Sequence, residues 1–441
     1  MISNLFNFDQ LAAISTSLIL FISIIVAMYS KRYFRGDSKR KNFFLMIFLI
    51  TISLISTFCA DNIILICVSW MISNALLVLM MIHKKNWDQA FQSGMLALRN
   101  FTIGAICLMF AMLILYFETG SYSIREILED DFISQKSIIA SSILIVIAAL
   151  TQCALYPFHS WLTSSLNSPT PASAIMHAGL VNGGGILLAR FAPIILELPN
   201  LMVVIFVIGI FSAIFGTLLK LVQGNVKGML ACSTMSQMGF MIAQCGMGLF
   251  PAAIAHLFWH GMFKSYLFLS SPGSWQEKRF DLQYPPKFPS FFLSLLCGFS
   301  GAFIFAKTNG VEFHKFDTTL ILVSVAFIAA SQVSLTIIDK FPLKNIVPAI
   351  VISSLLSFVY GLSVTFVENI MSPEIFQPQK INIGHISATL AMLFFWVARL
   401  FMQKSTKEIN PIFLKGYVKI LNAGQPDSKT ITNNRNQYTY R

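Results

Sequence analysis

Three titratable residues stand four positions apart in one apolar stretch of the chain: His256, His260 and Lys264. Residues four apart lie on the same face of an α-helix, so these side chains would form one ridge. A histidine changes charge near neutral pH, and burial brings the pKa of a lysine down toward that range. The ridge therefore predicts proton or cation passage through intervening water, with hydrogen-bonded packing as the alternative role. A zinc site at the two histidines lacks a third ligand.

His177 is a fourth candidate, because it follows two expected interruptions of a helix. In the stretch from Gln152 to Arg190, the apolar run breaks at Pro157 and again at Pro169-Thr170-Pro171. An interruption at membrane depth exposes backbone groups that protein or water must satisfy. This stretch is thus the best candidate for a transport site. Arg99, near the start of another apolar run, is expected at the membrane interface.

The elements that must position these residues are membrane-spanning helices. Hydrophobic residues make up 56% of the 441 and charged residues only 11%, whereas a water-facing surface needs far more charge. Apolar runs of about 18 to 22 residues recur, each long enough to cross a ~30 Å hydrocarbon core. The sequence predicts an all-α polytopic protein with about thirteen spans. These spans are placed at about 11–29, 43–59, 63–82, 95–117, 137–157, 171–191, 201–222, 229–248, 251–270, 289–306, 317–338, 346–367 and 383–402.

Basic residues concentrate in alternate loops and predict the orientation. The opposite loops are poor in Lys and Arg, and one of them carries Glu126, Glu129, Asp130 and Asp131. By the positive-inside rule, the N-terminus is expected outside and the C-terminal tail in the cytoplasm. The net charge of +12 fits basic cytoplasmic loops and does not indicate nucleic-acid binding. The basic loop residues are Lys31, Arg32, Arg35, Lys39, Arg40, Lys41, Lys84, Lys85, Lys227, Lys278, Arg279, Lys287, Lys340 and Lys344.

Composition also predicts the domain boundary and argues against cysteine chemistry and a carboxylate cation site. The seven cysteines lie in or beside apolar runs without a CxxC pair, so we expect small buried hydrophobes. No Asp or Glu falls near the middle of a predicted span, which disfavours a carboxylate-based cation site. Residues 1–402 are predicted to form the transmembrane domain. Residues 403–441 are a polar tail, either disordered or docked to a cytoplasmic partner, with Tyr438 and Tyr440 near its end.

Six motifs follow one another between about Tyr29 and Ser271. They are YSKRYFRGD at Tyr29, ADN at Ala60, PFHSWL at Pro157, SPTPASAIMHA at Ser168, KGMLACSTMSQMGF at Lys227 and AHLFWHGMFKSYLFL at Ala255. In this order they resemble the antiporter-like membrane subunits of respiratory complex I and the Mrp-type cation antiporters. The resemblance implies inverted repeats, discontinuous helices and a hydrated proton path across the middle of the membrane.

The resemblance carries over to individual residues. The family histidine on the resumed helix matches His177, and the later family row matches His256, His260 and Lys264. Lys227 matches as well. These matches agree with the ridge derived from spacing and add Lys227 to the path.

The chain departs from the family at one pair of positions. A family glutamate after the early tryptophan pairs with a lysine on the first broken helix, but Met71 and Gln152 stand at these positions here. Substitution of both partners leaves no unpaired buried charge, which indicates a divergent branch.

The size, the lack of the extra C-terminal helices of the family and the terminal run NAGQPDSKTIT are most similar to one branch. This branch holds the DabB-type membrane subunits of prokaryotic inorganic-carbon accumulation complexes. It implies a large soluble DabA-type partner on the cytoplasmic face, with a zinc site like that of β-carbonic anhydrases. That partner would hydrate CO2 to bicarbonate, and cation flow through the membrane subunit would keep hydration one-way.

Together these inferences predict a transporter subunit of the prokaryotic inner membrane, with catalysis and zinc in the partner and no cofactor of its own. Protons are favoured over Na+, because Na+ sites need oxygen ligands and often a carboxylate. Two alternatives are a proton-translocating subunit of a complex I or Mrp-like assembly and a non-conducting membrane anchor for a cytoplasmic enzyme. The predicted path residues are His177, His256, His260 and Lys264, with Lys227 and Arg99 in support.

Overall fold

The computed structural model describes residues 5–84, 86–276, 286–338, 344–371, 373–401 and 411–431. Within these ranges the chain is helical, and its β-pairing consists of isolated bridges such as Leu249 with Phe376. The all-α prediction is therefore confirmed. Some residues used in the sequence analysis lie outside the described ranges: Lys85, Lys278, Arg279, Lys340, Tyr438 and Tyr440.

Eleven helical segments of the described residues are long and apolar enough to cross a membrane. Two further helices of 21 residues, α12 and α13, pack among these segments, which is compatible with the thirteen predicted spans. The eleven segments are α1 (Gln10–Tyr33), α2 (Arg40–Phe58), α3 (Ile63–Met81), α4 (Asp88–Thr119), α6 (Gln135–Gln152), the interrupted segment Thr170–Arg190, α11 (Pro199–Leu221), α14 (Phe288–Thr308), α15 (Thr319–Ile338), α16 (Ile346–Ile370) and α17 (Ile383–Phe401).

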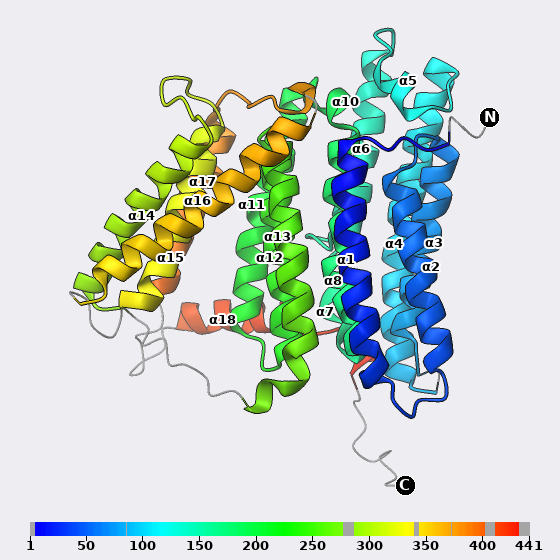
Figure 1. The fold of residues 1–441 in the computed structure, drawn as a ribbon, viewed down its shortest axis with the longest axis horizontal. Coiled ribbons are helices and arrows are strands. Elements are labelled where there is room, and N and C mark those ends of the chain that lie inside the picture. Colours follow the sequence, from blue (N-terminus) through cyan, green and yellow to red (C-terminus); the bar gives the residue numbers. More distant parts are fainter. Residues whose placement is uncertain are drawn as a thin grey trace.

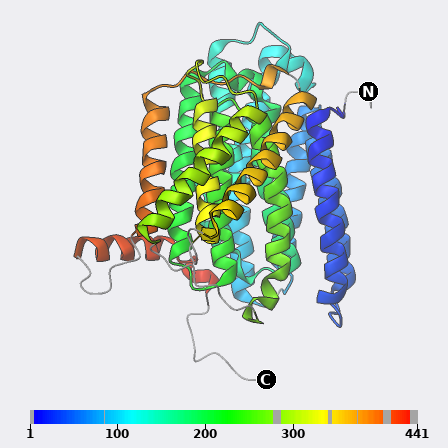
Figure 2. The same ribbon diagram turned by 60° about the vertical axis from the view of Figure 1, so that its left-hand side comes forward.

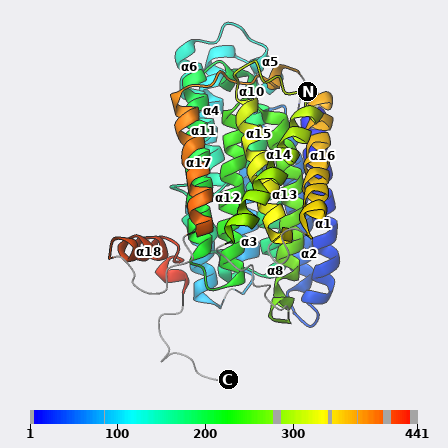
Figure 3. The same ribbon diagram turned by 90° about the vertical axis from the view of Figure 1, so that its left-hand side faces the viewer.

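The helices form two groups on either side of a central pair (Figure 1). Helices α1 to α6 lie on one side, and α14 to α17 lie on the other. Between them stand α12 (Val226–Gly246) and α13 (Phe250–Ser270). When the molecule is turned by 90° about the vertical axis, α17 is seen beside α11, and both helices end on the same side of the bundle (Figure 3). The central pair thus contacts both groups.

Glycines bring α11 and α12 together backbone to backbone. A methyl group on Gly209 would lie 2.5 Å from the backbone N of Ala243. One on Gly239 would lie 2.6 Å from the backbone N of Ala213. Small residues at such contacts allow close packing of membrane helices, for which apolar burial gives no driving force.

Short helices cover the two ends of the bundle. Helices α5 (Ile124–Leu128) and α10 (Ala192–Leu196) lie at the end where α1 begins. Helix α18 (Pro411–Ala423) lies at the opposite end, across the direction of the spans, and projects beyond the bundle (Figures 1 and 2). Within the polar tail, residues Pro411–Ala423 are therefore helical.

The predicted ends of two spans differ from the structure. The fifth predicted span continues to residue 157, but α6 ends at Gln152, and Ala154 adopts a left-handed backbone with φ 52°. The apolar run therefore continues past the end of the helix. Helix α4 begins at Asp88, before the predicted start at 95. After α6 the chain forms α7 (Ser160–Thr163), η2 (Ser165–Asn167), α8 (Thr170–Ala178), η3 (Leu180–Asn182) and α9 (Gly183–Arg190).

Candidate ion path at the interrupted helix

The interruption between α8 and α9 frees backbone carbonyls, and side chains satisfy them. Asn182 Nδ2 donates to Ala178 O over 2.7 Å, and Gln152 Nε2 donates to Leu180 O over 3.2 Å. The Cys153 thiol donates to Val181 O over 3.2 Å. Non-helical backbone is tolerated at membrane depth only where protein or water satisfies it. The chain leaves the helix around Pro157 and before α8, as predicted, and the further interruption between α8 and α9, which was not predicted, is stabilised by polar side chains.

Helix α8 presents His177 to the face of α13. A methyl group on Gly261 would lie 2.9 Å from Ala178 O, so the two helices approach closely there. The His177 ring stacks on Phe268 with centroids 4.1 Å apart and planes at 15°. This contact fixes the plane of the imidazole within the bundle.

One backbone carbonyl links His177 to Lys264. His177 Nδ1 lies 3.0 Å from Thr234 Oγ1, and the Thr234 hydroxyl lies 3.0 Å from Leu230 O. Lys264 Nζ donates to the same Leu230 O over 3.2 Å. His177 and Lys264 are each 1% exposed. Helix α12 therefore joins two predicted path residues that stand on different helices.

The two histidines of α13 continue the row. The rings of His256 and His260 lie 6.1 Å apart at 22°. His260 is buried, and its Nε2 has no hydrogen-bond partner among the described residues. A buried polar nitrogen without a protein partner is typically satisfied by water. The ridge predicted from the four-residue spacing is thus confirmed as a geometric feature.

Lys227 lies at the end of the row nearest α18. Its Nζ donates to Ser168 O over 2.7 Å and approaches Leu166 O at 3.5 Å. The half-buried lysine thus binds the loop just before α8. Since α8 carries His177, this contact connects Lys227 to the same interrupted segment.

A C-terminal strap, defined as residues 424–431, covers the loop that Lys227 binds. Asn167 Nδ2 donates to Thr430 O over 2.9 Å. The backbone N of Asp427 donates to Ser164 Oγ over 2.9 Å. Thr430 is buried in this contact. The strap therefore lies on the interrupted segment at the α18 end of the bundle.

Arg99 is not brought to this row. It is exposed on α4, a helix that packs chiefly against α3 and α6. Its neighbour Asn100 is buried and donates to Phe158 O over 3.3 Å. The polar contact with the interrupted region thus comes from Asn100.

Met71 and Gln152 are not partners in the structure. Met71 is 53% exposed on the outer face of α3, whereas Gln152 is 2% exposed. The Gln152 amide donates to Asn74 Oδ1 over 3.0 Å, so its partner is the residue one turn beyond Met71. Asn74 was missed from the sequence. The sequence shows Asn74 only as one polar residue within an apolar span, which does not identify its partner.

Thr234 was missed as well, because a threonine in an apolar helix commonly bonds to its own backbone. Thr234 does so, yet its hydroxyl also meets His177. Its place in the run STMSQ at Ser233 gave no indication of the partner.

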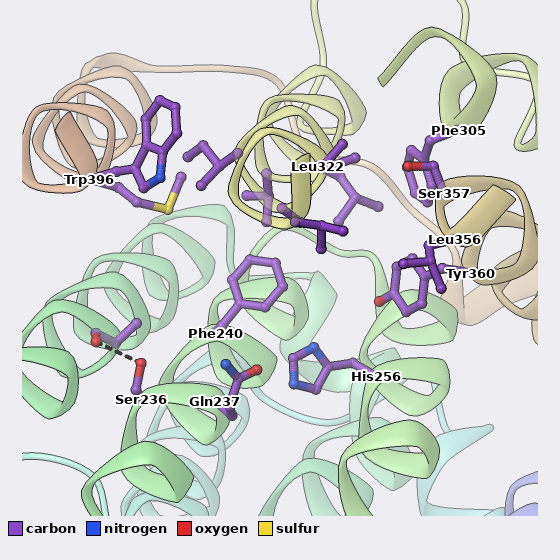
Figure 4. A pocket seen from close by; sticks show the side chains of 18 of the residues that line it. Ser236, Gln237, Phe240, His256, Phe305, Leu322, Leu356, Ser357, Tyr360 and Trp396 are labelled. Carbon is purple, nitrogen blue, oxygen red and sulfur yellow. Dashed lines mark hydrogen bonds between the residues drawn. The ribbon is translucent and has the colours of Figure 1, made fainter. Parts of the chain in front are cut away.

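A cavity of about 580 Å³ separates the central helices from α14 to α17 (Figure 4). His256 and Gln237 line one wall, and Tyr360 lines another. Most of the remaining lining is aliphatic or aromatic, including Phe240 and Leu322. His256 therefore stands between the buried row and this cavity.

Residues 60–284 match the family described as NADH:quinone oxidoreductase/Mrp antiporter, TM. The chain belongs to this family. Residues 2–44 also match the N-terminus of chain 5 of NADH-ubiquinone oxidoreductase, complex I. The larger matched range contains the interrupted helix and the whole row from His177 to Lys264. The family resemblance inferred from the motifs is thus confirmed.

Several curated relatives in this family are inorganic carbon transporter subunits. The chain is 32% identical over 279 residues to the probable inorganic carbon transporter subunit DabB1 of Halothiobacillus neapolitanus, covering 62% of this chain and 50% of that protein. It is 34% identical over 275 residues to the probable subunit DabB of Bacillus anthracis, covering 62% and 54%. The chain thus spans about half the length of the curated relatives it matches.

Complex I subunits and a solved antiporter assembly are similar as well. The chain is 30% identical over 268 residues to NADH-ubiquinone oxidoreductase chain 5 of Schizophyllum commune, covering 60% of this chain and 39% of that protein. A chain of the Mrp complex from Dietzia sp. has a TM-score of 0.65 at 21% identity, covering 94% of this chain and 52% of that chain. This likeness confirms the antiporter-like fold.

Proposed function

We propose that this chain is the ion-translocating membrane subunit of an inorganic-carbon transport complex. The observation that carries the proposal is the link from His177 through Thr234 and Leu230 O to Lys264. It brings two buried protonatable groups to one carbonyl, which accepts from Thr234 and from Lys264 and so holds both sides of the path in place. Ionisable groups at membrane depth mark ion pathways by default.

The path runs from His256 through His260 to the His177–Lys264 pair and leaves past Lys227. Ring-to-ring separations such as the 6.1 Å between His256 and His260 are bridged by water. The transported ion is H+, since the row presents nitrogen atoms, while Na+ is bound by oxygen ligands. Na+ is the second candidate. Arg99 has at most an indirect role, because it is exposed on α4.

Reconstitution tests the path directly. The protein is placed in liposomes with a pH-sensitive dye inside, and H+ or Na+ gradients are applied in turn. We expect His260→Ala together with Lys264→Ala to abolish H+ flux. Growth of a producing strain in air gives the second readout. Carbon uptake that is unchanged in the double variant would place the path elsewhere.

The carbon chemistry belongs to a partner in this proposal. A large soluble subunit with a zinc site, of the DabA type, binds the cytoplasmic face and hydrates CO2, and cation entry keeps the reaction one-way. Support comes from the similarity to inorganic carbon transporter subunits. The tail and α18 provide the docking segment, in an inner membrane with the N-terminus outside.

Purification from the native membrane separates this proposal from a complex I or Mrp-like role, which the similarity to chain 5 supports. A single large zinc protein that co-purifies supports the carbon complex. Quinone oxidoreductase or other antiporter subunits in its place would support the second role.

A non-conducting anchor is the third candidate, favoured by the neutral Gln152 at one position of the family ion pair, where it bonds to the neutral Asn74. An uncoupler distinguishes it. If carbon accumulation by the complex is insensitive to collapse of the ion gradient, the membrane subunit is an anchor.

A further inference from the structure

The cavity between the central helices and α14 to α17 has no assigned role in the ion path. Its volume of about 580 Å³ is within the range of small-molecule sites. The labelled side chains that point into it include Phe240, Leu322 and Trp396 (Figure 4). Cavities lined by apolar side chains stay dry and bind apolar molecules. The cavity is therefore suited to hydrocarbon.

Two cations stand in the last turns of α11 and α17, two of the helices that line this cavity. Arg399, in the last turn of α17, lines the cavity itself. Lys220 stands in the last turn of α11, which packs against α17 and ends on the same side of the bundle. Among the described residues, neither forms an ion pair with an acid. Two neighbouring cations without a counter-ion attract an anion.

Helix α18 supplies further positive charge at the same end. It packs against α11 and lies across the span direction (Figures 2 and 3). Leu414 and Val418 share one face of α18, while Lys415 and Lys419 share another, and all four side chains are exposed. Amphipathic helices of this kind lie in the headgroup region of a membrane. The cation pair is thus at headgroup depth.

We infer that the cavity and the Lys220–Arg399 pair form a binding site for an anionic phospholipid. One acyl chain fills the cavity between α12, α15 and α17, and the phosphate is bound by the two cations. Basic pockets between spanning helices bind anionic headgroups in this way. The acyl chain covers His256 on the cavity side, so that protons on the row do not leak into the second helix group. The site is independent of which ion or partner the chain serves.

Native mass spectrometry of the full chain in detergent tests the site. The protein is titrated with 1-palmitoyl-2-oleoyl-phosphatidylglycerol, with the phosphatidylcholine of the same chains and with inorganic phosphate alone. We expect the anionic lipid to bind at one site and to raise the unfolding temperature. Lys220→Gln and Arg399→Gln should each weaken its binding by roughly fivefold. Ala326→Phe, which fills the cavity from α15, should weaken it without removing a charge.

Lys307→Gln is the matched control, because this lysine is exposed at the end of α14 away from α18. It should bind the lipid as the wild type does. Equal affinity for the two lipids would overturn the inference, as would a phosphate-only effect or unchanged binding in both cation variants. Lipid binding is measured here without ion flux, so this test and the test of the proposed function fail separately.

Discussion

Gln152 donates a hydrogen bond to Asn74 over 3.0 Å, and both amides are buried in the bundle core. The same Gln152 amide nitrogen also caps the freed carbonyl of Leu180. The pair is therefore structural support for the interrupted helix. Because it is uncharged, it costs less to bury than an ion pair and does not respond to pH.

This relationship predicts strong coupling between the two residues. Gln152→Leu and Asn74→Leu should each lower the free energy of unfolding by about 1–3 kcal/mol, because each leaves a buried amide without its partner. The loss of unfolding free energy in the double variant should be clearly smaller than the sum of the losses in the two single variants. Thermal unfolding in nanodiscs measures all three variants. Strictly additive losses would show that the amides do not act as a pair.

Thr234 should control proton flux by orienting His177. Thr234→Val keeps the volume of the side chain but removes the hydroxyl 3.0 Å from Nδ1. One hydrogen bond contributes about 1 kcal/mol, so flux should fall roughly fivefold. A dye assay in liposomes gives the rate. Ser236→Ala is the control, because that hydroxyl bonds to Thr217 and Ala213 on α11. Wild-type flux in Thr234→Val would remove Thr234 from the path.

The loop pair Asp37–His83 predicts a pH-dependent stability. The hydrogen bond from His83, at 3.0 Å, lowers the pKa of the Asp37 carboxyl below its usual range, with a smaller contribution from the backbone N of Lys39. The stabilisation is thus present above the unfolded pKa of about 3.9 and is lost as pH falls through the folded pKa. Asp37→Asn should cost about 0.5–1 kcal/mol at neutral pH, given partial exposure.

The measurement is the unfolding temperature of wild type and Asp37→Asn from pH 3 to pH 8. The difference should be constant above about pH 5 and should shrink below about pH 4. Asp131→Asn, in an exposed loop at the other end of the bundle, serves as the surface control. A difference that does not change with pH would contradict the assignment.

Two glycines, Gly239 and Gly416, should respond differently to substitution by alanine. A methyl group on Gly239 would meet the backbone of α11 at 2.6 Å, so the helices must separate, at a cost of about 1–3 kcal/mol. Gly416 on α18 has no neighbour within 4 Å of such a methyl group. Gly416→Ala should leave the unfolding temperature of the bundle unchanged. Similar unfolding temperatures for the two variants would mean that α11 and α12 are not in backbone contact.

The strap should be released when its main hydrogen bond is removed. Thr430 is 5% exposed, so a cysteine placed there, in a background without the native cysteines, should react slowly with a maleimide. Adding Asn167→Ala removes the donor to Thr430 O and should speed the reaction several-fold. Asn422→Ala on the exposed side of α18 should not change the rate. Fast labelling before any substitution would show that the strap is not bound.

Local patterns in the sequence predicted much of this site. The spacing of His256, His260 and Lys264 sets them on one helical face, and the prolines before His177 mark the break between α6 and α8. Both features depend on residues close together in the chain. Likewise, apolar run length identified the spans, because the hydrocarbon core fixes the length that a helix needs.

Contacts between distant segments were not predictable in the same way. Gln152 and Asn74 are 78 positions apart, and His177 and Thr234 are 57 apart. The sequence shows that Asn74 is polar, but it does not show which distant residue Asn74 forms a hydrogen bond with. The end of α6 was also missed, since the apolar residues continue where the backbone turns away.

The strap also has a consequence for the order of synthesis. Asn167 and Thr430 are 263 positions apart. At about 5–20 residues per second, roughly 13–50 s separate their emergence from the ribosome. During this interval the interrupted helix is already in the membrane while its cover is still being translated. An insertase or chaperone that binds the loop before α8 during this interval would cover its polar groups until the strap is made.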